Sequence, residues 1–302
     1  MRLPVRRHRK GSPERGPRAS KGACMPPSEL GLPLSRLQVP DIREEVLRRG
    51  LVAEISGSTI WRWLDEDALR PWTFRSWIFP RDPDFEAKAG RVLDLYAGKF
   101  DGRRLGPNEY ILSADEKTSI QARCRCHPGL PPARSRAARV EHEYERCGAL
   151  QYMVAWDVRR ARLFSRCERS TGIDPFGRLV EQVMKIEPYR SADRVFWVVD
   201  NGSSHRGLAS IKRLECAYPN LRLVHCPIHS SWLNQVEIYL SIVQRKVLTP
   251  NDFPNVDEVE RRLTDFERRY ERAAKPFEWK FTHRDLANLL RRLAAHSQTK
   301  AA

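Results

Sequence analysis

The sequence predicts an α/β fold, with a mixed five-stranded sheet flanked by helices and a small helical unit before it. Two observations support this prediction. From residue 109 onward, short apolar segments typical of strands alternate with amphipathic segments typical of helices. Residues 36–70 instead show two helical segments in succession. Hydrophobic residues make up 41% of the 302-residue chain, which is enough to bury a sizeable core.

Residues 1–35 are expected to form a basic, disordered arm. Within residues 1–22, eight Lys and Arg side chains stand against one Glu, together with repeated Gly, Pro and Ser. So few apolar side chains cannot offset the conformational entropy that ordering this segment would cost.

Residues 36–70 predict a helix-turn-helix unit. Asp41 can cap the first helix, Gly50 can end it, and a Ser-rich segment then precedes the second helix. In this motif the second helix lies in the major groove of DNA, with its N-terminal residues at the base edges. Those residues would here be Ser58, Thr59 and Arg62.

Residues 71–108 are expected to be a linker followed by a helix, and residues 109–296 to form the main domain. Its strands are expected at 109–118, 152–158, 161–168, 194–201 and 221–228, and its helices at 173–186, 210–218, 230–248, 256–273 and 282–296. After a three-strand meander, strands alternate with helices. This order, β-β-β-α-β-α-β-α, is that of the ribonuclease-H-like fold.

The composition indicates a polyanionic partner and a reducing compartment. Lys and Arg number 54 against 38 Asp and Glu, a formal net charge of +16, and such basic side chains bind phosphates by releasing their counterions. Seven Cys residues spread through the chain favour free thiols, and Cys124, Cys126 and His127 lack a standard zinc spacing. No apolar run is long enough for a membrane helix, and no secretory signal is expected.

Two acids follow strongly apolar strands. Asp115 comes after YILSA, and Asp200 comes after VFWVV. Active sites of open α/β sheets lie at the carboxyl ends of strands, so the two carboxylates meet at one edge if their strands are neighbours. Glu237, in the first two turns of the helix predicted at 230–248, can be aimed at the same edge.

Three converging carboxylates repel one another unless cations neutralise them. Mg²⁺ prefers oxygen ligands of this kind, and two ions about 3.5–4 Å apart can hold a scissile phosphate between them. The spacing of the acids does not by itself select the trio, because an Asp at a strand end is often a turn or capping residue. Asp157 also ends an apolar strand and competes for the site, while Glu116 and Glu237 could each be surface carboxylates.

Three sequence blocks carry a resemblance to a known family. They are LSADEKTSIQA at 112–122, VVDNGSSH at 198–205 and HCPIHSSWLNQVEIYLS at 225–241. Together with SWIFPRDPDFEAKA, VEHEYERCGAL and KPFEWKFT, they make the chain resemble transposases of the insertion sequence 630 family over roughly residues 36–293. This family is the bacterial branch of the mariner superfamily.

The resemblance implies that Asp115, Asp200 and Glu237 are the catalytic and metal-binding acids of a DDE transposase. It further implies cutting at the terminal inverted repeats of a mobile element, with two Mg²⁺ ions, or Mn²⁺ in their place, as cofactor. Transfer of the freed 3′-hydroxyl ends into target DNA would follow. The expected setting is a homodimer on double-stranded DNA in the bacterial cytoplasm, associated with the nucleoid.

Residues around the acids suggest supporting roles. Lys117 and His205 could contact DNA. The helix that carries Glu237 could be capped and positioned by Ser230, Ser231 and Asn234.

Two other functions remain open. Members of the resembled family usually carry two helix-turn-helix units, whereas this chain has room for one, at about 41–69. A catalytically silent DNA-binding relative, acting as a regulator or left as a decayed remnant, is therefore the alternative. A structure-selective nuclease on the same fold is a third candidate, and the helix-turn-helix and the SSWLNQVE block argue against it.

Overall fold

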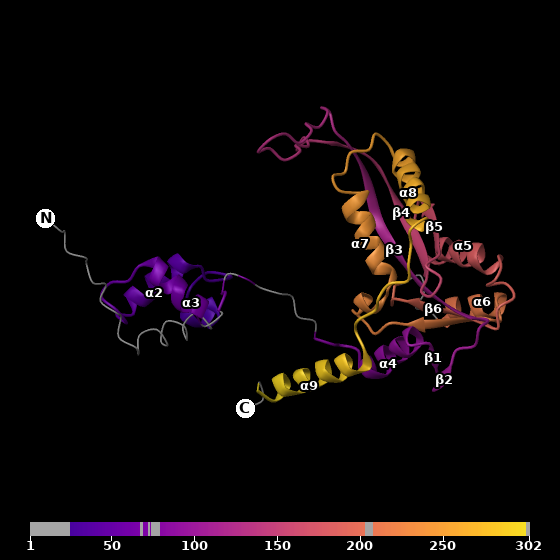
Figure 1. Ribbon diagram of the computed structural model, residues 1–302, viewed down its shortest axis with the longest axis horizontal. Helices are drawn as coiled ribbons and strands as arrows, with labels where there is room; N and C mark the ends of the chain where they lie inside the picture. The colour runs from indigo at the N-terminus through magenta and orange to yellow at the C-terminus, as the bar shows by residue number, and fades with distance from the viewer. Residues whose placement is uncertain (1–24, 67–68, 72, 74–78, 203–207, 300–302) are drawn as a thin grey trace. The chain divides into compact units, whose positions relative to one another are not determined.

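The computed structural model describes residues 25–66, 69–71, 73, 79–202 and 208–299 (Figure 1). The chain divides into two compact units, Met1–Ile78 and Phe79–Ala302. Among the described residues, no helix combines the length and the apolar character that crossing a bilayer requires.

The first unit is built on two helices, α2 (Val39–Arg48) and α3 (Gly57–Glu66). Its core is formed by their apolar faces, including Ile42, Val46, Ile60 and Leu64. A short 3-10 helix, η1 (Pro27–Leu30), adds the buried side chain of Leu30. The expected arm is therefore too long at its C-terminal end, because residues 25–35 contribute to this core; residues 1–24 lie outside the described residues.

The helix-turn-helix expectation needs two corrections. Asp41 is not the N-cap of α2 but its third residue, where its carboxylate accepts a hydrogen bond from the backbone N–H of Gln38 (2.7 Å). The connection between the helices is not a tight turn, since it spans residues 49–56. The physical reason is that Val52 and Ile55 in this connection are buried in the core. Gly50 ends α2 as expected, with a φ of 64° that favours glycine.

The second unit contains the five-stranded sheet, in the order β5-β4-β3-β6-β7. The strands are β3 (Glu109–Cys124), β4 (Glu145–Asp157), β5 (Leu163–Glu168), β6 (Arg194–Val199) and β7 (Leu221–His225). Strand β3 pairs parallel to β6, and β6 parallel to β7, whereas β4 is antiparallel to both of its neighbours. The predicted mixed sheet is thus confirmed.

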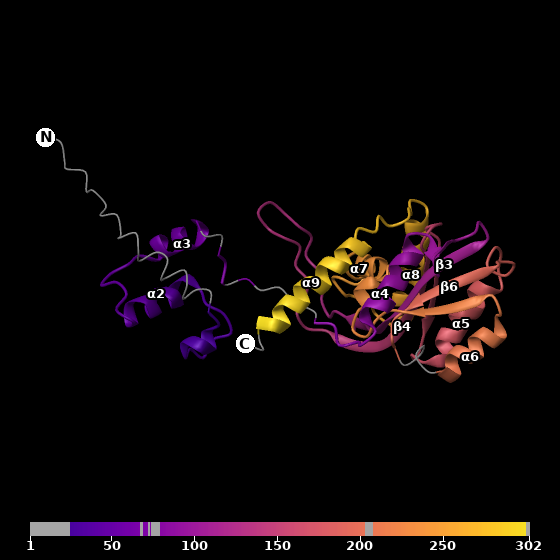
Figure 2. The same cartoon turned by 90° about the horizontal axis from the view of Figure 1, so that it is seen from below.

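Helices cover both faces of this sheet (Figure 2). One face packs against α5 (Ile173–Met184) and α6 (Leu208–Ala217). The other packs against α4 (Phe85–Tyr96), α7 (Val236–Lys246), α8 (Val256–Glu271) and α9 (His283–Thr299). Side chains alternate between the two cores along each strand, as in Phe196 and Trp197 of β6.

The N-terminal boundary of this unit differs from the expected one. Helix α4, the helix expected within residues 71–108, buries Phe85, Ala89 and Val92 in the same core as the sheet. A two-stranded hairpin, β1 (Lys99–Phe100) and β2 (Arg103–Arg104), follows it. The unit therefore begins near residue 79 rather than 109, because the apolar face of α4 has the sheet as its partner.

The segment between α8 and α9 fastens the sheet to the helices through aromatic contacts. Phe277, Trp279 and Phe281 stand at alternate positions, and the ring of Phe277 lies 4.7 Å from that of Trp156. Trp279 packs on Tyr96 of α4 and Phe281 on Trp232 (5.2 and 5.0 Å between ring centroids). Such pairs are typical of well-packed cores.

Candidate active site

The register of two strands places Asp115 and Asp200 side by side. The last parallel pair of β3 and β6 is Ser113 with Val198, and each acid lies two residues beyond its member of that pair. Strand alternation therefore directs both carboxylates to the face of Val198, which packs in the core with α7. Strand β3 extends beyond the expected 109–118 to Cys124, and after Ser113 it pairs with β4 alone.

The electrostatics of Asp115 show that the three predicted acids influence one another. Burial raises the pKa of Asp115 most strongly, the charges of Asp200 and Glu237 raise it further, and the resulting pKa is about 8. Part of the effect is offset by the backbone N–H of Glu116, which donates to the Asp115 carboxylate (2.8 Å). Burial and the charges of Asp115 and Asp200 also raise the pKa of the buried Cys226 thiol.

Glu237 lies in the first turn of α7, and Ser113 of β3 holds that helix end in place. The Ser113 hydroxyl accepts a hydrogen bond from the backbone N–H of Val236 (2.8 Å) and donates one to the Asn234 side chain. Asn234 in turn donates to the backbone carbonyl of Ala114 (2.8 Å). Ser113 and Asn234 are fully buried, so these bonds form away from competing water.

Helix α4 adds a second clamp on the same segment. The Tyr96 hydroxyl donates to the carbonyl of Leu233 (2.9 Å) and accepts from the N–H of Gln235 (3.2 Å). The segment before α7 is therefore fixed from the strand and from a helix, which determines where Glu237 can reach.

This arrangement corrects the predicted capping roles. The helix that carries Glu237 begins at Val236 and not at the serines, because residues 231–233 form a separate 3-10 turn, η2 (Ser231–Leu233). Ser230 is buried with its hydroxyl 3.5 Å from the Ile228 carbonyl, and Ser231 caps no helix in the described part of the chain. Of the three residues predicted to position this helix, only Asn234 does so, through its hydrogen bonds to Ala114 and Ser113 of β3.

Hydrogen bonds also shape the segments that follow Asp200 and β7. The Asp200 carboxylate accepts the backbone N–H of Gly202 (2.7 Å), and the Asn201 amide donates to the Cys226 carbonyl. Asp82, buried at the start of the unit, accepts the N–H of Ile228 (2.9 Å) and pairs with Lys88 (3.0 Å). Burial alone would raise the pKa of Asp82, but these hydrogen bonds outweigh it and lower the pKa.

Asp157, the competing acid, belongs to a different part of the fold. Its carboxylate accepts the backbone N–H groups of Arg159 and Arg160 (3.0 and 2.9 Å) and the hydroxyl of Tyr189 (2.7 Å). Burial raises its pKa, and these donors oppose the rise. Asp157 therefore shapes the turn after β4, and its partner Tyr189 belongs to the core on the opposite face of the sheet.

The donor chemistry of the acids fits a hard divalent cation, because all three supply carboxylate oxygens and a cation would relieve the repulsion that raises the Asp115 pKa. The positions of these carboxylates in the structure, in contrast, do not fit a bound cation. Among the described residues, no three His, Cys, Asp or Glu side chains are gathered closely enough to hold a metal ion. The carboxylates of Asp115, Asp200 and Glu237 thus interact electrostatically without standing in coordinating positions.

The predicted DNA contacts fall at several places. Lys117 lines a cavity of about 470 Å³ together with Glu237, whereas His205 lies outside the described residues. In the first unit, Ser58 and Arg62 are exposed on α3, and the hydroxyls of Ser58 and Thr59 both contact that of Ser56 (2.9 Å).

Sequence reasoning missed Trp61, whose side chain is 52% exposed next to Arg62. Its exposure could have been inferred, since Ile60 and Leu64 define the buried face of α3 and Trp61 falls outside it.

Comparison with known families identifies the central part of the second unit. Residues 111–260 match the family described as DDE superfamily endonuclease. This stretch holds all three acids. Residues 111–260 are a DDE superfamily endonuclease domain. No curated protein sequence matches the chain significantly.

Solved structures of the Mos1 mariner transposase share the fold of the chain. The Mos1 paired end complex with Mn superposes with a TM-score of 0.56 at 15% identity, covering 97% of this chain and 79% of that chain. The corresponding complex with Mg gives 0.53 at 15% identity (97% and 81%), and a pre-cleavage Mos1 transpososome gives 0.52 at 16% identity (96% and 80%). At such identities the likeness shows the fold, and the expected ribonuclease-H-like fold of the DDE domain is confirmed.

Proposed function

We propose that the chain is a DDE transposase of the insertion sequence 630 type, which cuts DNA at the terminal inverted repeats of a mobile element and transfers the 3′-hydroxyl ends to target DNA. The observation that carries the proposal is the electrostatic coupling of Asp115, Asp200 and Glu237 at one edge of the DDE domain. The match of residues 111–260 to the DDE superfamily endonuclease supports it.

In the proposed reaction, Asp115, Asp200 and Glu237 hold Mg²⁺ or Mn²⁺, as two ions. When bound, the ions would supply Lewis-acid activation of the attacking oxygen and neutralise charge on the leaving 3′-oxygen. The chain itself positions the acids. The register of β3 and β6 brings the two aspartates side by side, and Ser113 with Asn234 fixes the start of α7. A positioned phosphate reacts faster because the entropic cost of orientation has been met in folding.

The DNA partner is proposed from charge and from the fold. A net charge of +16 favours a polyanion, and the similar Mos1 structures are a paired end complex and a transpososome. We place duplex recognition on α3, through Ser58, Thr59, Arg62 and the exposed Trp61. Lys117, which lines a cavity with Glu237, would contact DNA nearer the acids, and His205 is kept as a proposed DNA contact. A homodimer would hold both element ends, and a location at the bacterial nucleoid would follow.

The alternative is a catalytically silent DNA-binding relative. One observation favours it: the three carboxylates are not in coordinating positions among the described residues. It predicts salt-sensitive DNA binding with no cleavage in any metal, and binding unchanged by substitution of the acids.

The test is a strand-transfer assay on labelled DNA carrying the sequences that flank the gene, with Mn²⁺ or Mg²⁺. The transposase proposal predicts nicked ends and joined products, both absent for Asp200→Ala. DNA binding with no nicking in either metal would reject it in favour of the silent relative. Nicking without joined products would instead indicate a nuclease.

A further inference from the structure

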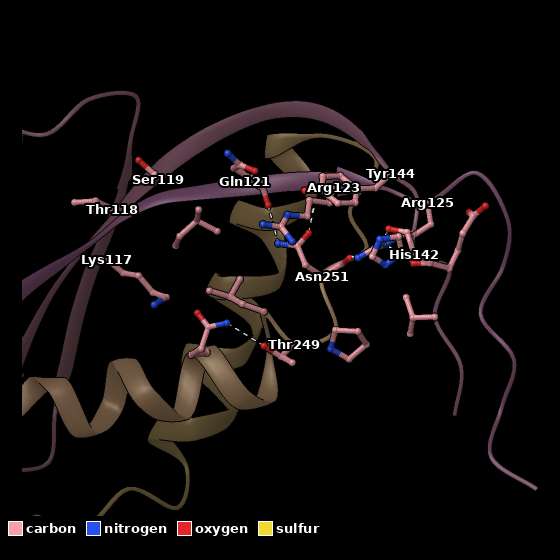
Figure 3. A pocket seen from close by; sticks show the side chains of 16 residues that line it. Lys117, Thr118, Ser119, Gln121, Arg123, Arg125, His142, Tyr144, Thr249 and Asn251 are labelled. Carbon is pink, nitrogen blue, oxygen red and sulfur yellow. Dashed lines mark hydrogen bonds between the residues drawn. The ribbon is translucent and has the colours of Figure 1, made fainter. Parts of the chain in front are cut away.

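A cavity of about 850 Å³ lies beside the acids, between the outer half of β3 and the end of α7 (Figure 3). Its walls combine cations with amide side chains, namely Lys117, Gln121, Arg123, Arg125, Gln244 and Asn251. Glu141 is the one acid among the described lining residues, and its carboxylate is engaged by the backbone N–H and the ring of His127 (2.7 and 2.6 Å). We call this cavity the β3 groove; its charge is net positive.

The β3 groove continues into the candidate active site. Lys117, Thr118 and Gln244 line both the groove and the smaller cavity that contains Glu237. Glu237 and Gln244 are seven residues apart on α7, so they lie on the same face of the helix about 10 Å from each other. A polymer whose reacting group sits at Glu237 would therefore extend along α7 into the groove.

Arg123 and Tyr144 provide a ready contact for a nucleotide. The guanidinium carbons of Arg123 and Arg125 lie 4.6 and 4.9 Å from the centroid of the Tyr144 ring. Within the described part of the chain Arg123 has no acidic partner, and its buried Nε has no hydrogen-bond acceptor. The side-chain oxygen of Gln121 is likewise buried without a donor. Unpaired buried polar atoms are unfavourable unless something else, such as a ligand, completes their bonds.

The neighbouring Arg125 differs from Arg123 in this respect. Its guanidinium donates to the backbone carbonyls of Glu141 and His142 (2.6 and 2.9 Å). Arg125 therefore fixes the base of the loop between β3 and β4, which carries Tyr144, while Arg123 keeps its charge available to the groove.

The groove is also formed in advance of any ligand. The Asn251 side chain donates to the Gln121 carbonyl (2.8 Å) and accepts the N–H of Arg123 (3.1 Å), and the N–H of Phe253 donates to the Arg123 carbonyl (2.9 Å). These bonds fasten the segment after α7 to β3. A preformed site binds more tightly because less conformational entropy is lost on binding.

We propose that the β3 groove holds a single DNA strand adjoining the phosphate at the acids, with Arg123 on a backbone phosphate and Tyr144 against a base. This inference rests on the proposed function, because it supplies the strand that the acids would cut. A volume of about 850 Å³ suits a few nucleotides of one strand rather than a duplex, since it falls among small-molecule sites of roughly 300–1,000 Å³. Cationic grooves with an aromatic side chain are the usual means of binding single strands.

The first measurement is the affinity of the full chain for a fluorescein-labelled oligothymidine, by fluorescence anisotropy. Arg123→Gln should weaken binding about tenfold and make it less salt-dependent, because one phosphate contact is lost. Tyr144→Ala should weaken it about five- to tenfold, whereas Tyr144→Phe should bind nearly as wild type, because the ring carries the stacking. The matched control is Arg103→Gln, an exposed arginine of β2 whose side chain makes no ion pair among the described residues, which should leave the affinity unchanged.

The second measurement locates the strand. Oligothymidine containing 4-thiothymidine should cross-link to the tryptic peptide 140–146, which contains Tyr144. Equal affinity of Arg123→Gln and Arg103→Gln, with both variants folded by circular dichroism, would overturn the inference. So would cross-linking of this peptide to a fully duplex probe as efficiently as to the single strand.

The same variants separate this inference from the proposed function. If the protein cleaves DNA with metal, but Arg123→Gln binds oligothymidine as tightly as wild type, the inference about the β3 groove is wrong and the transposase proposal stands. Binding and cross-linking that depend on Arg123, in a protein that cleaves nothing, would reject the transposase proposal and support strand binding in the groove.

Discussion

Replacing Ser113 with Ala tests whether this strand residue holds the helix of Glu237. The hydroxyl of Ser113 is fully buried, accepts the Val236 N–H (2.8 Å) and donates to Asn234. Ser113→Ala leaves one buried donor and one buried acceptor unpaired, each costing about 1–3 kcal/mol. We therefore expect the free energy of unfolding to fall by about 2–6 kcal/mol.

The assay is urea denaturation followed by tryptophan fluorescence, with the loss taken from the midpoint shift and the slope. Ser231→Ala is the control, because Ser231 was expected from sequence to cap the helix and makes no capping bond among the described residues; its effect should stay within about 0.5 kcal/mol. A loss below about 0.5 kcal/mol for Ser113→Ala, equal to that of the control, would refute the clamp. A genuine clamp also predicts that Ser113→Ala lowers DNA cleavage more than DNA binding, since Glu237 loses its position.

Three further predictions follow from the acids. Because the folded pKa of Asp115 is about 8, above its ordinary 3.8, the folded state keeps a proton that the unfolded chain releases, so metal-free stability should fall as the pH rises from about 4 to about 8. Thermal melts across this range should show the fall, and Asp115→Asn should flatten it; an unchanged slope would contradict the assignment. Mg²⁺ or Mn²⁺ should raise the melting temperature at pH 8 by relieving carboxylate repulsion, and an equal rise in Asp200→Ala would count against the site. Asp157→Ala should destabilise the fold by about 2–4 kcal/mol, because the buried Tyr189 hydroxyl and two partly buried backbone N–H groups lose their acceptor. It should keep the metal-induced rise in melting temperature, and loss of that rise would make Asp157 a candidate metal ligand again.

The sequence allowed most of the sheet to be predicted, because each strand contains a short apolar run followed by polar or turn residues. All five predicted strands of the main domain are present, and the predicted helices at 173–186 and 256–273 match α5 and α8 closely. The length of β3 was missed for a local reason. Its outer half pairs with β4 alone, through two irregularities, and Ser119 has a φ of 52°, so the regular alternation that marks a strand is broken there.

Contacts between distant segments could not be predicted from one sequence. Ser113 is an unremarkable serine in a strand, and only the folded chain brings its hydroxyl to Val236, 123 residues later. For the same reason the sequence predicts that Ser230 and Ser231 cap the helix of Glu237. In the structure, Ser113 of β3 accepts the hydrogen bond from the first N–H of that helix instead. The helix at α4 is expected from the sequence, but its place in the main domain is not, because its partner, the sheet, lies elsewhere in the sequence.

The choice between Asp115 and Asp157 shows what strand register adds. Both acids follow apolar residues, and the apolar pattern alone ranks them equally. In the sheet, Asp115 pairs with Val154 and shares its face, which packs with α7, whereas Asp157 bonds to Tyr189 on the other face. Register, which a single strand does not encode, decides which carboxylate can meet Asp200.

The most direct test of the central claim compares four carboxylates in one DNA cleavage assay with Mn²⁺, using DNA that carries the sequences flanking the gene. Asp115→Asn, Asp200→Asn and Glu237→Gln should each abolish cleavage while DNA binding is kept, and Asp157→Asn should cleave nearly as wild type. Cleavage that survives any of the first three substitutions, or that is lost equally in Asp157→Asn with the fold intact, would contradict the assignment of the site.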